Sequence, residues 1–185
     1  MLRVISGSKK GYRLKAPKGK DTRPTEDRIK ESLFNILRQI DEESIVLDLY
    51  AGSGSIGIEF LSRGAKKAYF VDKSYSSIKA IRENLSHTDL MGKAEIIKKD
   101  ALKAIEQISS QKVQFDYIFI DPPYGQNLII KTLQKILRED ILKEKGIIIV
   151  EHEKELTLED RIFEFSKSDC RNYGSKLLTF YIINC

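Results

Sequence analysis

Short apolar runs alternate with longer segments of helical spacing through the middle of the chain, from residue 44 to residue 151. The runs are "SIVLDLY", "AYFVD", "AEIIKKD", "FDYIFID" and "GIIIVE". Segments between them, such as "SIKAIRENL" and "IIKTLQKIL", repeat apolar residues at the spacing of an amphipathic helix. This alternation predicts βαβ units, and therefore an α/β fold whose mostly parallel sheet carries helices on both faces.

The two ends of the chain follow other patterns. "RVISGSKKGYRLKAP" has two short alternating segments around a Gly-Ser-Lys-Lys-Gly turn, which predicts a β-hairpin. "TRPTEDRIKESLFNILRQI" predicts a helix, with Thr25 ahead of an acidic first turn and apolar residues at helical spacing: Ile29, Leu33, Ile36, Leu37 and Ile40. The tail has two strand-like runs joined near Asn172 to Gly174, so we expect an antiparallel hairpin at one edge of the sheet.

The positive charge is concentrated at the start of the chain. The net charge is +5, yet residues 1–30 alone hold ten Lys or Arg against three acidic residues. Such an opening is typical of an arm that binds a polyanion, and it favours nucleic acid as the partner. We therefore predict a basic hairpin arm over residues 1–24 and a larger domain over residues 25–185. The cations expected to contact RNA are Arg3, Lys9, Lys10, Arg13, Lys18 and Arg23.

Composition excludes several classes of protein. The 185 residues are 41% hydrophobic and 32% charged, which suits one globular domain with a real core. No apolar run approaches the roughly 20 residues of a membrane span, and charges interrupt the opening segment where a signal peptide would be apolar. Two cysteines without a CxxC pair and two distant histidines give no support to a metal site. We expect a cytoplasmic protein without a metal.

A glycine-rich loop follows the first strand-like run. In "DLYAGSGSIG", Gly52, Gly54 and Gly57 have the G-x-G-x-x-G spacing that lets a ligand approach the backbone at the start of a helix. Asp72 ends the next run, 20 residues after Gly52, where nucleotide-binding sheets place an acid that accepts from the ribose hydroxyls. Together these features predict an adenosine-containing ligand.

Two such ligands fit the loop, a dinucleotide such as NAD and S-adenosylmethionine. Asp48 lies just before the loop, where its carboxylate would repel a pyrophosphate but attract the ammonium and sulfonium of S-adenosylmethionine. Asp100 could accept from an adenine amino group. The acids therefore favour S-adenosylmethionine, with S-adenosylhomocysteine as the product. The predicted cofactor contacts are Asp48, Ala51, Gly52, Ser53, Gly54, Gly57, Asp72, Lys73, Asp100 and Ala101.

The run "FDYIFIDPPYGQ" ends in an acid, two prolines and an aromatic ring. Prolines end strand pairing and fix the backbone, so the acceptors around them are held still. The Asp121 carboxylate and the Pro122 carbonyl can accept hydrogens from a base amine and stabilise the positive charge that builds as its nitrogen takes a methyl group. A base can stack on Tyr124. We predict a catalytic motif of Asp121, Pro122, Pro123 and Tyr124.

At these residues the chain resembles a known family. "DLYAGSGSIGIEF" with "DPPY" is similar to class I S-adenosylmethionine-dependent methyltransferases that modify amino groups, whose fold is Rossmann-like. "RVISGSKKGYRL", "TRPTEDRIKESLFNIL" and "YGSKLLTFY" resemble the RsmD family of bacterial 16S ribosomal RNA guanine-N2 methyltransferases. The resemblance covers nearly the whole chain. Its departures are Ser6, where alanine is expected, and Ser55-Ile56, where Ala-Leu is more usual.

The resemblance implies a fold, a substrate and partners. It implies a seven-stranded sheet in residues 25–185, which form the methyltransferase domain, and an N-terminal hairpin that helps to engage RNA. The expected substrate is 16S ribosomal RNA in the small ribosomal subunit or its assembly intermediate, with ribosomal proteins as partners, no membrane and a monomeric enzyme.

Other amines remain open as substrates, including adenine N6 in DNA or RNA and protein glutamine. Glutamine enzymes usually have Asn where Asp121 stands, and DNA adenine enzymes generally add a recognition domain for which 185 residues leave no room. A different class of protein, an RNA-binding module of the same fold without catalysis, also remains open.

Overall fold

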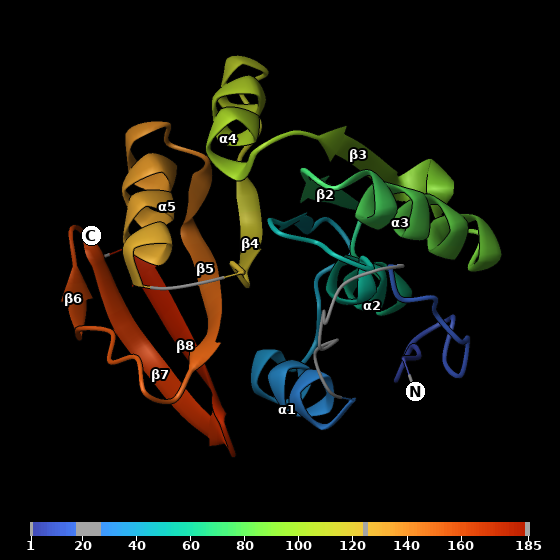
Figure 1. Ribbon diagram of the computed structural model, residues 1–185, viewed down its shortest axis with the longest axis horizontal. Helices are drawn as coiled ribbons and strands as arrows, with labels where there is room; N and C mark the ends of the chain where they lie inside the picture. Colours follow the sequence, from blue (N-terminus) through green and yellow to red (C-terminus); the bar gives the residue numbers. More distant parts are fainter. Residues whose placement is uncertain (1, 18–26, 124–125, 184–185) are drawn as a thin grey trace.

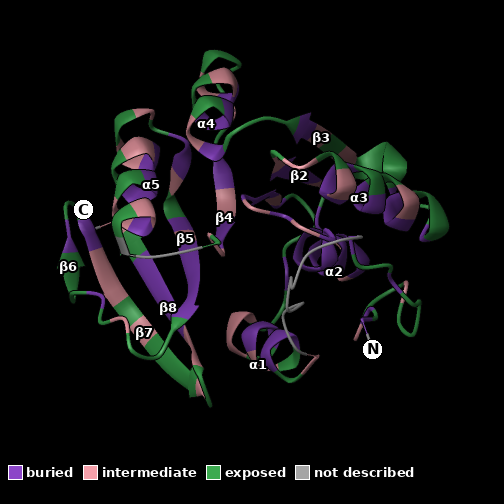
Figure 2. Ribbon diagram, in the orientation of Figure 1, coloured by how far each residue is buried: buried purple, intermediate pink, exposed green. Residues whose placement is uncertain are grey.

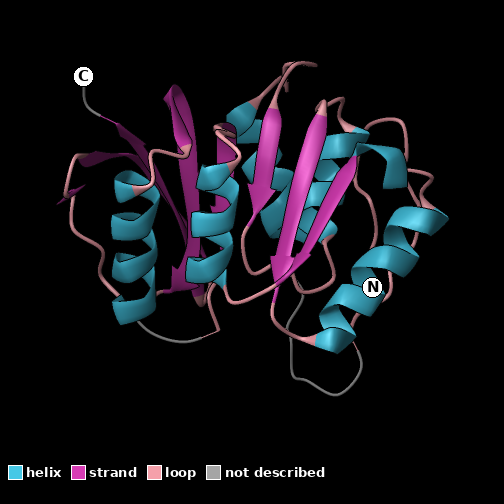
Figure 3. Cartoon of the chain, turned by 90° about the horizontal axis from the view of Figure 1, so that it is seen from above, coloured by secondary structure: helices cyan, strands magenta, loops and turns pink. Residues whose placement is uncertain are grey.

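A computed structural model describes residues 2–17, 27–123 and 126–183, and its centre is an eight-stranded sheet (Figures 1 and 3). The strand order is β3-β2-β1-β4-β5-β8-β7-β6. Strands β1 to β5 are parallel, and β8, β7 and β6 continue the sheet antiparallel. The strands are β1 Ile45–Asp48, β2 Lys67–Asp72, β3 Ala94–Lys98, β4 Phe115–Ile120, β5 Leu142–Glu153, β6 Arg161–Ile162, β7 Phe165–Tyr173 and β8 Lys176–Ile183.

Helices cover both faces of this sheet. They are α1 Asp27–Leu37, α2 Ser55–Ser62, α3 Tyr75–His87, the 3₁₀ helix η1 Met91–Lys93, α4 Ala101–Ser110 and α5 Gln126–Arg138. Figure 1 shows α4 and α5 along one face and α1 and α2 along the other. The alternation of strand and helix in the sequence therefore predicted the architecture correctly, because each parallel connection requires a crossover.

The core consists of two apolar layers, one on each face of the sheet. Consecutive strand residues point to opposite faces, so Phe119 packs with α1, α2 and α3 while Ile118 and Ile120 pack with α4 and α5. Both faces are buried (Figure 2), which explains why the central strands read as continuous apolar runs rather than as alternating ones.

The predicted antiparallel hairpin at the sheet edge is confirmed. Strands β7 and β8 pair in antiparallel register and are joined by Gly174, whose φ of 70° lies in the left-handed region that glycine adopts readily. The two-residue strand β6 adds an eighth strand to the predicted seven. Helix α1 ends at Leu37, three residues before the last predicted apolar position, because Arg38 turns to a φ of 60°. Thr25 lies outside the described residues.

The N-terminal hairpin packs on the α1 and α2 face. Its two limbs pair through the Val4 N–H, which donates to Tyr12 O (2.9 Å), and the Leu14 N–H, which donates to Leu2 O (2.8 Å). The side chains of Leu2, Val4 and Leu14 are buried in the core layer beneath α1, α2 and α3. Residues 2–17 therefore belong to the folded unit rather than hanging free of it.

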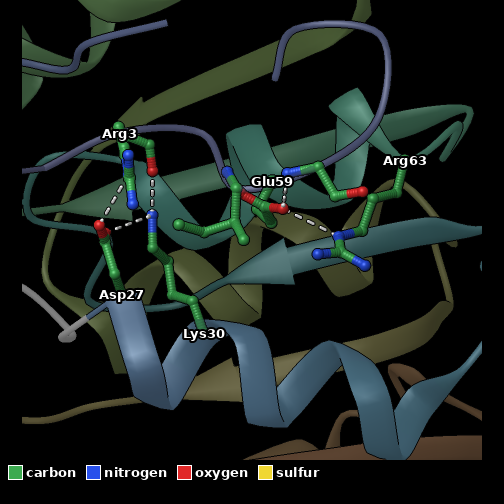
Figure 4. Close-up of polar contacts among 7 residues, drawn as sticks. Arg3, Asp27, Lys30, Glu59 and Arg63 are labelled. Atoms are coloured by element: carbon green, nitrogen blue, oxygen red, sulfur yellow. Dashed lines mark hydrogen bonds and ion pairs between the residues drawn. The ribbon is translucent and has the colours of Figure 1, made fainter. Parts of the chain in front are cut away.

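A buried carboxylate anchors this hairpin (Figure 4). Glu59 of α2 is fully buried and accepts from the N–H groups of Ile5 (2.8 Å) and Ser6 (3.0 Å) and from Arg63 Nε (2.9 Å). Lys30 of α1 is also fully buried; its ammonium donates to Arg3 O, and burial lowers its pKa. Two charged groups from separate helices thus hold the hairpin backbone in place.

Candidate active site

A cleft of about 780 Å³ opens at the carboxyl ends of the parallel strands. Ligands of open α/β sheets bind at this edge, where loops diverge from the strands. The acidic side chains that line the cleft come from the ends of five strands or from the loops just after them. They are Asp48, Asp72, Asp100, Asp121, Glu151 and Glu153.

The glycine loop forms one wall of the cleft. Ala51, Gly52 and Ser53 line it, and Gly52 has a φ of 55° with open space where a Cβ would stand. The Gly52 N–H donates to Asp72 Oδ2 (3.0 Å), and the Ser74 N–H donates to Asp72 Oδ1 (2.7 Å). Two backbone donors therefore fix the Asp72 carboxylate beside the loop, at the position predicted for a ribose acceptor.

The other two glycines of the motif serve the packing of α2. Gly54 caps the helix with a φ of 76°, and a Cβ on Gly57 would lie 2.3 Å from Phe70 Cε1. Neither lines the cleft. The Gly57 N–H donates to Asp48 Oδ2 (3.0 Å), so this glycine reaches the site only by holding Asp48.

Asp48 is a buried acid at the floor of the cleft. Burial, aided by the negative charges of Asp121 and Asp72, raises its pKa to about 8, although the hydrogen bond from Gly57 acts in the opposite direction. A carboxylate in such surroundings is stabilised by a cation more strongly than an exposed one would be. The site is therefore suited to a positively charged ligand and unsuited to a pyrophosphate.

The remaining predicted cofactor residues also reach the cleft. Lys73, Asp100 and Ala101 line it on the β2 and β3 side. Asp100 caps α4 by accepting from the Leu102 N–H (3.1 Å). Tyr50, which the sequence analysis did not select, lines the same wall, and its hydroxyl is bonded to Thr132 Oγ1 (2.8 Å).

The predicted catalytic motif follows β4, the neighbour of β1, and lines the same cleft as the glycine loop. Asp121, Pro122 and Pro123 line the cleft immediately after β4, whereas Tyr124 lies outside the described residues. Burial, aided by the neighbouring charge of Glu151, raises the pKa of Asp121 to about 7, although Lys176 acts in the opposite direction. The half-buried Asp121 thus titrates near neutrality.

Two residues beside Asp121 were not predicted. Lys176 Nζ lies 4.0 Å from Asp121 Oδ1 and 3.4 Å from Glu151 Oε1. Glu151 ends the apolar run of β5 as Asp72 ends that of β2, so its position at the end of a strand-like run was a signal that could have identified it. Lys176 starts the antiparallel strand β8, and only the strand order brings it to this edge.

The basic hairpin runs from α2 to the mouth of the cleft. Arg3, Lys10 and Arg13 are exposed and Lys9 is half-buried, while Lys18 and Arg23 lie outside the described residues. Arg3 is paired with Asp27 (3.0 Å). Lys9, Lys10 and Arg13 form no ion pair with any described residue. Ala16 and Pro17, at the end of the described hairpin, line the cleft.

In the described ranges, no His, Cys, Asp and Glu side chains are grouped as a metal site would require. His152 is held by Glu153 O (3.0 Å) and Thr179 Oγ1 (2.8 Å). Of the helices in the same ranges, none has both the length and the apolar character needed to cross a bilayer.

Comparison with known proteins agrees with this geometry. The family model described as conserved hypothetical protein 95 matches residues 2–182. The Bacillus subtilis protein YlbH, an rRNA methyltransferase by name, is 38% identical over 97% of this chain and 98% of its own length. Ribosomal RNA small subunit methyltransferase D of Haemophilus influenzae is 36% identical over 85% of this chain and 81% of its own length.

The chain belongs to the RsmD family. The resemblance read from the sequence motifs is therefore confirmed. A solved structure of yhhF from Escherichia coli, a methyltransferase by name, superposes with a TM-score of 0.85 at 27% identity, covering 100% of this chain and 98% of that one. This chain thus shares its Rossmann-like α/β fold, with a mostly parallel sheet and an antiparallel edge, with that solved structure.

Proposed function

We propose that this protein is an S-adenosylmethionine-dependent methyltransferase that acts on a guanine N2 amine of 16S ribosomal RNA in the small ribosomal subunit. One observation carries the proposal: the Asp121-Pro122-Pro123 segment after β4 lines the same cleft as the Ala51–Ser53 loop and the acids Asp48 and Asp72. Membership of the RsmD family and the names of its relatives support the ribosomal RNA substrate. A ribosomal substrate places the enzyme in the cytoplasm.

The cofactor fits one half of the cleft. Asp48, whose buried carboxylate is stabilised by a nearby cation, would hold the charged methionyl end, and Asp72 would accept from the ribose hydroxyls. Gly52 leaves room for close approach of the ligand, and Asp100 and Ala101 would border the adenine. When bound, S-adenosylmethionine supplies an electrophilic methyl group on its sulfonium.

The chain's own groups then act on the base. The Asp121 carboxylate and the Pro122 carbonyl accept hydrogen bonds from the amine. These hydrogen bonds draw the nitrogen lone pair away from the ring and stabilise the positive charge that develops on nitrogen. Because the pKa of Asp121 lies at about 7, the carboxylate is ionised above neutral pH and can also take the proton that the amine sheds. In this proposal Tyr124 stacks on the base.

The basic hairpin completes the proposal. Its exposed cations Lys10 and Arg13 carry no ion pair within the described chain, and its end reaches the mouth of the cleft. Phosphates of the RNA would therefore meet this positive surface as the target base enters. The small subunit or its assembly intermediate, with its ribosomal proteins, is the proposed partner of a monomeric enzyme.

Methyl transfer tests the proposal directly. Small-subunit particles from cells lacking the protein are incubated with labelled S-adenosylmethionine, and the RNA is digested for nucleoside mass spectrometry. We expect labelled N2-methylguanosine with the wild type. Calorimetry should show that Asp121→Ala keeps its cofactor affinity within a few fold. The activation barrier of methyl transfer should rise by about 2 to 4 kcal/mol in this variant. Tight NAD binding, or an active Asp121→Ala enzyme, contradicts the assignment.

A further inference from the structure

Asp121 does not stand alone at the catalytic end of the cleft. Strands β4 and β5 are parallel with Ile120 opposite Val150, so Asp121 and Glu151 follow at equivalent positions on neighbouring strands. Phe119 and Ile149 belong to the same core layer. Since side chains two residues apart share a face, Asp121 and Glu151 point to the same side of the sheet.

Lys176 joins these two carboxylates. It shares the face of Leu178, which pairs with Glu151 across the antiparallel β5 and β8 strands. Its ammonium lies 3.4 Å from Glu151 Oε1 and 4.0 Å from Asp121 Oδ1. Glu151 is only 3% exposed, yet it lines the cleft beside Asp121 and Pro122. The site thus has a second buried acceptor one strand away from the acceptor that is proposed to hold the amine.

A second acceptor on the neighbouring strand can discriminate between bases. The N2 amine of guanine is bonded to the ring carbon next to N1, and N1 carries a hydrogen. The N6 amine of adenine is also next to N1, but there N1 carries a lone pair. A carboxylate that faces the neighbour of the reacting amine would accept from guanine N1–H, whereas it would repel the N1 lone pair of adenine.

We propose that Glu151 selects guanine by accepting its N1–H while Asp121 and Pro122 accept from the N2 amine, with Lys176 positioning both carboxylates. This inference rests on the proposed function and deepens it, because it explains why this cleft takes guanine rather than adenine. The ammonium between the two acids reduces their mutual repulsion. Glu151 contacts the base, and Lys176 acts through the two carboxylates.

A single change in the target base tests the inference. The modified nucleotide is first mapped with the wild type, and particles are then rebuilt from ligated RNA that carries 2,6-diaminopurine at that position. This base keeps the 2-amino group but has a lone pair at N1 and an amino group in place of O6, so the Glu151→Gln variant is needed to assign the effect to N1. We expect the kcat/KM of the wild type to fall roughly 10- to 100-fold, as for the loss of a hydrogen bond to a charged group. Equal rates on both bases overturn the inference.

Glu151→Gln supplies the second arm, because its amide can donate to N1 of diaminopurine. We expect lower activity on guanine, a gain on diaminopurine and a change of at least about tenfold in the ratio between them. Glu155→Gln makes the same chemical change on an exposed residue outside the cleft and should leave the ratio unchanged. An unchanged ratio in Glu151→Gln refutes the role of Glu151.

The proposed function and this inference fail differently. If the wild type forms no N2-methylguanosine on particles that bear the natural guanine, the proposed function is wrong. If N2-methylguanosine forms but diaminopurine is modified equally well, only the role of Glu151 is wrong. Melting curves and S-adenosylhomocysteine binding show whether Glu151→Gln is folded. If it is not, the wild-type comparison of the two bases can still overturn the inference.

Discussion

Removing the charges of the hairpin should weaken RNA binding without unfolding the protein. The change is Lys9→Gln, Lys10→Gln and Arg13→Gln together. None of these side chains forms an ion pair with a described residue, and the hairpin is held instead by buried apolar side chains and by Glu59. Exposed charges contribute less than about 1 kcal/mol each to stability, so the melting temperature should move by only a few degrees.

The magnitude of the binding effect follows from counterion release. The slope of log affinity against log salt is negative, and each lost phosphate contact makes it shallower by about 0.7, so the loss of three contacts makes it shallower by about 2. A fourfold rise in salt concentration should therefore reduce the ratio of wild-type affinity to variant affinity by roughly 15- to 20-fold. Affinity for small-subunit particles is measured across salt concentrations, and binding of S-adenosylmethionine should stay unchanged.

Two controls sharpen this experiment. Lys112→Gln, Arg138→Gln and Lys145→Gln together remove the same charge from exposed positions just before β4, at the end of α5 and near the start of β5, away from the carboxyl ends of the strands. This control should leave the salt slope near that of the wild type. Glu59→Gln should instead cost about 2 to 4 kcal/mol of stability, because a buried carboxylate that accepts three hydrogen bonds is lost. If the hairpin variant matches the wild type in both affinity and salt slope, the hairpin does not bind RNA.

Three further predictions concern two acids of the cleft and one glycine of the loop motif. The kcat/KM of methyl transfer should fall as the pH drops through about 7, where Asp121 becomes protonated. Lys176→Met should move this fall to higher pH, because the cation that lowers the pKa of Asp121 is gone. A pH profile that does not move in the variant counts against Asp121 as the titrating group. The pKa of Asp48 is raised from 3.8 to about 8 in the folded protein, so its contribution to stability is present below pH 3.8 and is lost as the pH rises toward 8. Between pH 5 and 9 the melting temperature of cofactor-free Asp48→Asn should therefore decline less than that of the wild type. Parallel declines in the two proteins argue against the raised pKa. Denaturant titration should show that Gly57→Ala destabilises the protein by about 1 to 3 kcal/mol, because the added Cβ overlaps Phe70. The control Gly92→Ala, whose Cβ meets nothing within 4 Å, should be near neutral. Similar values for both variants would show that Phe70 moves aside at little cost.

The local pattern of residues was enough to predict the architecture. Parallel strands buried on both faces must be apolar throughout, and crossover helices must be amphipathic, so the order of strands and helices can be read from the sequence. Asp48, Asp72 and Asp121 stand at the ends of strand-like runs in the sequence, and they come together because the carboxyl ends of parallel strands lie at one edge. All three line the cleft.

The tertiary structure decided what depends on strand order and on packing across the chain. Lys176 lies at the start of an antiparallel strand, and it meets Asp121 only because β8 pairs with β5. Gly57 of helix α2 fits the spacing of a ligand-binding glycine, but its neighbour is Phe70 of strand β2. Spacing along a chain determines which residues share an element and a face, because it follows from local backbone geometry. Which elements become neighbours depends on the burial of whole faces, and no local pattern contains that information.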